Sequence, residues 1–136
     1  MRDRGSATAV EMLAVVMFGL VGLLFLGYVG RLHAAGIQVQ NTSQAAARAA
    51  SQAPDPDAAR VAMGSALATS SLTTRCDGAL SSALSWAPSP TGTWQGGSVT
   101  VVVSCTLGNE SLAGVWAPGD RTISSTDTQP VDRYQR

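Results

Sequence analysis

The sequence predicts an α+β protein with a long N-terminal transmembrane helix that continues into an extramembrane helix, a second short helix, and a small antiparallel sheet with one disulfide. Three observations predict this fold class. Residues 12–29 are apolar, residues 31–53 lack proline and are rich in alanine and glutamine, and residues 99–106 alternate with a period of two. We therefore expect helices in the first half of the chain and strands after residue 73.

The apolar segment 12–29 is the candidate membrane span. It carries no charge, and at 1.5 Å per residue a helix of this length spans roughly 27 Å, close to a hydrocarbon core. Arg2 and Arg4 precede it and only Arg31 follows closely, which favours a cytoplasmic N-terminus and an extracytoplasmic C-terminal domain. A cleaved secretory signal peptide and a plain uncleaved anchor stay open as alternatives, although the run is longer than a usual signal-peptide core.

The same helix is expected to continue through residues 31–53, where small apolar side chains recur at helical spacings. The predicted packing face consists of Leu32, Ala35, Val39, Ala46, Ala49 and Ala53, and the predicted solvent face of Gln38, Asn41, Gln44 and Arg48. Pro54 and Pro56 should end the helix, because proline cannot continue the hydrogen-bond ladder.

A second helix is expected to begin at Asp55. Asp55 is a good N-cap, Pro56 suits the first helical position, and Asp57 suits the positive end of the helix dipole. The helix should extend to about Ser70. Its expected apolar side is formed by Val61, Met63, Ala66, Leu67 and Leu72.

Strands are expected in the last part of the chain. The pattern over residues 99–106 predicts a strand with one buried face, formed by Val99, Val101, Val103 and Cys105. A partner strand is expected around residues 75–80, and residues 87–97 should form a loop because of their prolines and glycines. Residues 121–129 predict a final edge strand, polar on both faces and closed by Pro130.

The two cysteines of the chain, Cys76 and Cys105, both lie in the part outside the predicted membrane helix. This placement predicts one structural disulfide formed in an oxidising compartment, and it would stabilise so small a head by about 3 to 4 kcal/mol. Two unpaired buried thiols are the alternative. With a single histidine, His33, these residues are too few for a zinc site.

Composition argues against several classes of function. The formal net charge is zero and no basic stripe is present, so we expect no nucleic-acid partner. His33 stands alone at the predicted membrane exit, and no phosphate-binding glycine loop occurs. We therefore expect no enzyme activity, no cofactor and no metal.

Glu11 is the residue with the clearest physical argument, because an ionisable group at the edge of hydrocarbon is costly and usually functional. If the chain is cut just before Ser6, Glu11 could pair with the new terminal amine of a neighbouring subunit in a filament. Alternatively, it reaches the cytoplasmic headgroups and favours its own helix N-terminus. Four glycines project onto an arc of about 140° around this helix, with Glu11 just beside the arc, and they would allow close helix packing: Gly19, Gly22, Gly27 and Gly30.

The stretch Arg4-Gly5-Ser6-Ala7-Thr8-Ala9-Val10-Glu11, followed by the apolar helix, resembles the start of the TadE-like proteins. These are minor pilin or pseudopilin components of tight-adherence (Tad/Flp) pilus systems. Residues 40–51 resemble the extramembrane helix of that family, and residues 122–136 resemble the tail of its actinobacterial members.

The resemblance implies a division of the chain into a prepilin-like leader (1–5), a transmembrane helix (6–30), its extramembrane continuation (31–53) and an external head (54–136). A prepilin peptidase would cut between Gly5 and Ser6, and Glu11 would be the assembly glutamate. That cut makes Glu11 the sixth mature residue, whereas the glutamate of the family is usually the fifth. A cut after Ser6 would restore the usual spacing.

By this resemblance the chain would act as a minor pilin or pseudopilin-like membrane protein in assembly of a Tad-type adhesion pilus or a related secretion apparatus. Its implied partners are membrane lipid, the prepilin peptidase, other pilin subunits and the Tad membrane assembly platform. It would cross the cell membrane once, with the head outside. The alternative is a membrane-anchored extracytoplasmic binding module that does not polymerise.

Overall fold

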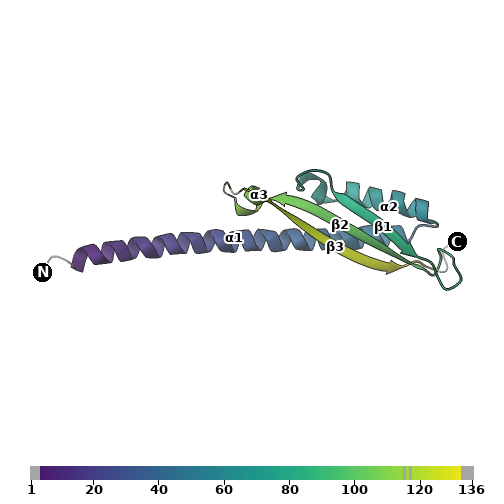
Figure 1. The fold of residues 1–136 in the computed structure, drawn as a ribbon, viewed down its shortest axis with the longest axis horizontal. Helices are drawn as coiled ribbons and strands as arrows, with labels where there is room; N and C mark the ends of the chain where they lie inside the picture. Colours follow the sequence, from purple (N-terminus) through teal and green to yellow (C-terminus); the bar gives the residue numbers. More distant parts are fainter. Residues whose placement is uncertain (1–3, 115, 117, 133–136) are drawn as a thin grey trace.

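The structure, a computed structural model, describes residues 4–114, 116 and 118–132, with side chains from residue 8 onward. It confirms the α+β fold class: a long helix extends from a head that contains shorter helices and a three-stranded antiparallel sheet (Figure 1). The elements in chain order are α1 (Arg4–Ser51), α2 (Pro56–Ala68), the 3₁₀ helix η1 (Ser71–Thr74), β1 (Ser81–Ala87), β2 (Ser98–Gly108), α3 (Asn109–Ala113) and β3 (Asp120–Pro130).

Helix α1 is a single helix of 48 residues, roughly 72 Å long at the standard rise. The predicted membrane span and its continuation therefore form one element, which contains no proline to interrupt it. Its N-terminal half projects away from the head, whereas its C-terminal half packs against the sheet (Figure 1). It ends at Ser51, shortly before Pro54, as the prolines predict.

The buried face of α1 includes the predicted stripe but is wider. Val39 and Ala46 are buried as predicted, and so is Ala53 just beyond the end of α1. Ser43, Ala47 and Ala50 are also fully buried. The reason is that this half of α1 packs against two partners, the sheet on one side and α2 on another. Small side chains allow both to approach, and Ser43 Oγ bonds Ser125 Oγ of β3 at 3.0 Å.

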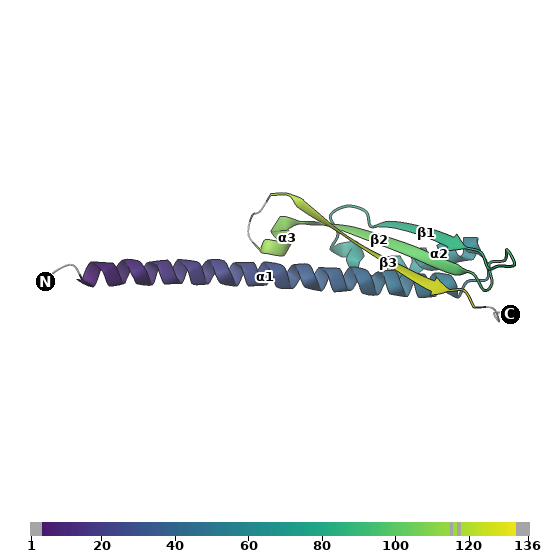
Figure 2. The ribbon, with the colours of Figure 1, turned by 60° about the horizontal axis from the view of Figure 1, so that its bottom comes forward.

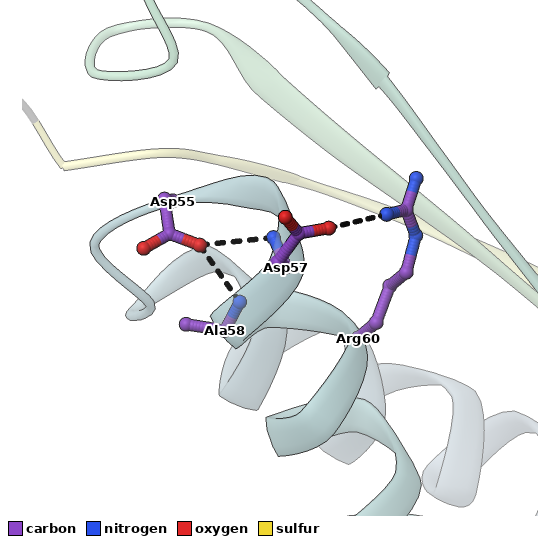
Figure 3. A network of polar contacts seen from close by, with 4 residues as sticks. All are labelled: Asp55, Asp57, Ala58 and Arg60. Carbon is purple, nitrogen blue, oxygen red and sulfur yellow. Dashed lines mark hydrogen bonds and ion pairs between the residues drawn. The ribbon is translucent and has the colours of Figure 1, made fainter.

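Helix α2 begins as predicted. The Asp55 carboxylate accepts hydrogen bonds from the backbone N–H groups of Asp57 and Ala58 at 2.9 and 2.8 Å, and Pro56 opens the helix (Figure 3). Its buried residues are Ala59, Met63 and Leu67. The prediction for Val61 was wrong, because its side chain is 74% exposed. Two residues from Ala59 or Met63 correspond to about 200° around a helix, so Val61 faces solvent.

We predict that Asp55→Ala lowers the free energy of unfolding of the head by about 1 kcal/mol, because two helix N–H groups lose their acceptor. Arg60→Ala is the matched control. It removes only the exposed pair with Asp57 and leaves both carboxylates at the start of α2, and such surface pairs contribute little (Figure 3). Denaturant unfolding of both variants compares the two losses, and an equal loss in both would contradict the capping role of Asp55.

Strand β2 lies at the centre of the sheet, between β1 and β3, and both pairings are antiparallel. Its inward side chains are buried as predicted: Val99, Val101, Val103 and Cys105, followed by Leu107. β3 is an edge strand that ends at Pro130, also as predicted. Cross-strand hydroxyl pairs, such as Thr100 with Thr128 at 2.9 Å, occupy the outer face.

The partner strand of β2 was predicted at the wrong place. Residues 71–74 form η1, residues 75–80 form a connection that contains Gly78 at φ 92°, and β1 begins only at Ser81. A regular strand cannot include a residue with positive φ, so pairing starts after it, with Ser81 opposite Ser104. The predicted loop follows β1, and Gly97 is required there because a Cβ would lie 2.3 Å from the Ala87 carbonyl oxygen.

Candidate functional site

The N-terminal half of α1 exposes a continuous apolar surface. From Val10 to Val29, the large hydrophobic side chains are between 42% and 79% exposed, apart from Tyr28, which is partly buried. The most apolar stretch of this helix has no part buried in the structure, and the helix is long and apolar enough to cross a membrane. So large an apolar surface marks a site for lipid or for another apolar surface.

The glycines of this segment leave the helix surface open. A Cβ added at Gly19, Gly22, Gly27 or Gly30 would meet no atom within 4 Å. Each glycine therefore marks a position where a neighbouring helix or a lipid chain could approach the α1 backbone closely. Nothing within the described head uses these positions.

Glu11 is exposed in the third turn of α1. It is the only acidic residue of the sequence between residues 4 and 54. The first turn of α1 carries no acidic residue, so Glu11 lies beyond the part of the helix where the dipole most favours a carboxylate.

Gly5 and Ser6, the predicted cleavage residues, both lie at the start of α1. Their backbone is helical, and the surroundings of their side chains fall outside the described residues. The structure thus places them about one and a half helical turns before Glu11 on the same element.

The predicted disulfide is confirmed. Cys76 and Cys105 are joined by an S–S bond of 2.03 Å, with their Cα atoms 5.4 Å apart. Cys105 is buried on the inner face of β2, whereas Cys76 belongs to the connection between η1 and β1. The Asp77 backbone N–H donates to the Thr106 carbonyl oxygen at 2.7 Å, so this connection follows β2 even though it is not a strand.

Helix α3, which sequence patterns did not predict, places further polar groups beside α1. Arg31 of α1 donates to the Leu112 carbonyl oxygen at 3.5 Å. Arg31, Leu112, Gln38 and Arg75 are among the residues that line a groove of about 580 Å³ between α1, η1 and α3. No sequence motif links these residues, because positions 31, 75 and 112 meet only through the tertiary fold.

The groove carries both signs of charge. Arg75 donates to Gln38 Oε1 at 3.0 Å, and neither Arg31 nor Arg75 pairs with a carboxylate of the residues described. Asp77 also lines the groove, where its carboxylate accepts from the Gly108 N–H. The groove therefore has an excess of positive charge.

Within residues 4–114, 116 and 118–132, no group of three or more histidine, cysteine or acidic side chains is placed to hold a metal. Both cysteines are in the disulfide, so neither thiol can act as a ligand or nucleophile.

The fold and these features define a class of protein: a small disulfide-bonded α+β head carried on one long helix whose free half is apolar. Comparisons with protein-family models, with curated proteins and with solved structures found no match.

Proposed function

We propose that this chain is a minor pilin or pseudopilin-like membrane protein, of the TadE-like kind, that acts in assembly of a Tad-type adhesion pilus or a related secretion apparatus. One observation carries the proposal. The free half of α1 is exposed and apolar on all sides, yet it holds a single carboxylate, Glu11, near its start. A plain anchor has no need of that carboxylate.

The energetic argument concerns the partner of Glu11. A carboxylate drawn into hydrocarbon or into a packed bundle of helices costs several kcal/mol unless an opposite charge meets it. Cleavage before Ser6 would create a positive terminal amine on each neighbouring subunit, close to the level of Glu11. Such a pair would stabilise only one axial offset between adjacent subunits, and the open glycine positions of α1 would allow their helices to approach.

The proposed orientation is an N-terminus in the cytoplasm and a head outside the cell membrane. The disulfide supports it, because disulfides persist in oxidising compartments. The arginines before the apolar segment support it as well. The proposed partners are membrane lipid, the prepilin peptidase, other pilin subunits and the Tad membrane platform.

Processing is tested by intact mass and N-terminal sequencing of the full chain, purified from membranes of cells that contain or lack the prepilin peptidase. We expect the protein from peptidase-containing cells to begin at Ser6. A start at Ala7 would mean that Glu11 is the fifth mature residue, and the two outcomes differ by the mass of one serine. An unchanged N-terminus in both strains would contradict processing.

The second candidate function is an anchored extracytoplasmic binding module that does not polymerise. The groove between Arg31 and Arg75 favours it, because a filament core does not require a charged groove in the head. This candidate predicts an unprocessed chain that stays in the membrane fraction and is absent from sheared pili. The mass measurement and pilus fractionation together separate the two candidates.

A further inference from the structure

Trp116 is the most exposed tryptophan of the three in the sequence. Its side chain is 83% exposed, compared with 39% for Trp86 and 8% for Trp94. It lies in the connection between α3 and β3, and this connection is held without its help. The Asn109 backbone N–H donates to the Gly119 carbonyl oxygen at 2.9 Å, and the Asn109 side chain donates to the Pro118 carbonyl oxygen at 3.1 Å. The fold thus leaves this large aromatic ring mostly exposed.

Contacts with Arg31 show how far along α1 the start of this connection lies. The Arg31 guanidinium donates to the Leu112 carbonyl oxygen, and a Cβ built on Gly114 would lie 2.8 Å from the same guanidinium. Arg31 follows the last apolar residue, Val29, by only two positions, which is roughly 3 Å along the helix. Leu112 and Gly114 therefore lie near the level where the apolar segment ends, and Trp116 follows Gly114 by two positions. Helix α3 stands at the end of the head nearest the free half of α1 (Figure 2).

The head even overlaps the apolar segment. Tyr28, inside that segment, is partly buried against the core of the head, whereas Leu26 beside it is 67% exposed. No stalk separates the apolar surface from the head. If α1 crosses a membrane, α3 and its connection must then lie in the headgroup layer, and tryptophan and tyrosine prefer that layer because their rings are apolar with one polar edge.

We propose that α3 and Trp116 form a second membrane contact, in which the Trp116 ring enters the glycerol and headgroup layer of the extracytoplasmic leaflet. This inference rests on the membrane-spanning role proposed for α1. The occupant is phospholipid, because the exposed Trp116 ring follows α3 close to the level where the exposed apolar face of α1 ends, the exposed α3 residues Glu110 and Ser111 are polar, and Arg31 brings a positive charge to that level. The contact would orient the head relative to the membrane before assembly.

The other two tryptophans provide an internal control. Trp94 Nε1 donates to the Ala53 carbonyl oxygen at 2.8 Å, beyond the C-terminal end of α1, and Trp86 stacks edge-on against Trp94 with ring centroids 5.4 Å apart. From Val29 to Ser51, α1 extends roughly 33 Å. Both rings therefore lie far from any bilayer that the apolar segment crosses.

The test reconstitutes the full chain into phospholipid vesicles whose acyl chains carry bromine, a contact quencher of tryptophan emission, close to the glycerol. In the wild type we expect the bromine to quench about one third of the tryptophan emission, because one of the three tryptophans would be in contact with lipid. Trp116→Phe should abolish the quenching, and the matched variant Trp86→Phe should retain it. Bromine placed near the ends of the acyl chains should quench less.

Flotation of the vesicles separates the two proposals. If the protein floats with the vesicles but Trp116 is not quenched, the second contact is refuted and the membrane span stands. If the protein does not float, both fail. Quenching that is absent at all lipid ratios, together with Trp116 emission shifted to the blue, would assign the ring to a contact between subunits and would also overturn the inference.

Discussion

Glu11→Ala is expected to abolish incorporation of the protein into pili while its amount in the membrane stays unchanged. Alanine favours both the helix and the hydrocarbon, so insertion of α1 should not suffer. What is lost is the proposed partner of the terminal amine on the adjacent subunit. Removing one member of a desolvated ion pair costs about 3 to 5 kcal/mol, which exceeds a tenfold loss of affinity. Immunodetection in sheared pili and in membranes measures both quantities.

Two further variants separate charge from shape at this position. Glu11→Gln keeps the length of the side chain but not its charge, and we expect it to fail as Glu11→Ala does. Asp57→Ala removes an exposed carboxylate in the first turn of α2, beyond the C-terminal end of α1, and should assemble normally. Normal amounts of Glu11→Ala protein in pili would refute the pairing and leave Glu11 as an interfacial residue.

Removal of the disulfide, by Cys76→Ala combined with Cys105→Ala, is expected to lower the free energy of unfolding of the head by about 3 to 4 kcal/mol. The bond closes a loop across 29 positions, which contains β1 and most of β2. β1 is an exposed edge strand, so it depends on this closure to stay paired with β2. The loss is large for so small a head. Denaturant unfolding of the full chain in detergent, followed by the emission of the buried Trp94, measures the midpoint.

Reductant supplies the control for this prediction. It should lower the unfolding midpoint of the wild type to that of the double variant and leave the double variant unchanged. Alkylation without prior reduction should label neither Cys76 nor Cys105. A wild-type midpoint that does not respond to reductant would show that the bond contributes little to the head.

Local sequence patterns were sufficient to predict those helices and strands that are encoded by residues adjacent in the sequence. The proline-free stretch of α1, the Asp55 cap of α2 and the alternation in β2 are each encoded by neighbouring residues, and each was predicted correctly. β1 was misplaced because six of its seven residues are exposed. Buried and exposed residues therefore do not alternate along this strand, and the sequence pattern that identified β2 is missing. Val61 was placed on the wrong face because apolarity alone was used, without the angle that separates it from Met63.

Some residues of the candidate site could also be recognised from the sequence, and others could not. Glu11, the cleavage residues and the cysteines stand out in the chain itself, because a lone carboxylate, a small-residue junction and a pair of thiols are informative wherever the chain folds. The disulfide and the long apolar helix could be inferred from the sequence without coordinates, whereas the roles of Gly5, Ser6 and Glu11 stay predictions.

Only the tertiary structure decided which distant residues meet. It brought Leu112 and Gly114 to Arg31, two residues after the last apolar residue of the exposed segment. It also widened the buried face of α1 to include Ala47 and Ala50, because two partners pack on that helix. Hydrophobicity and helix propensity depend on each residue and its near neighbours, whereas these contacts depend on how the sheet and α3 close over α1.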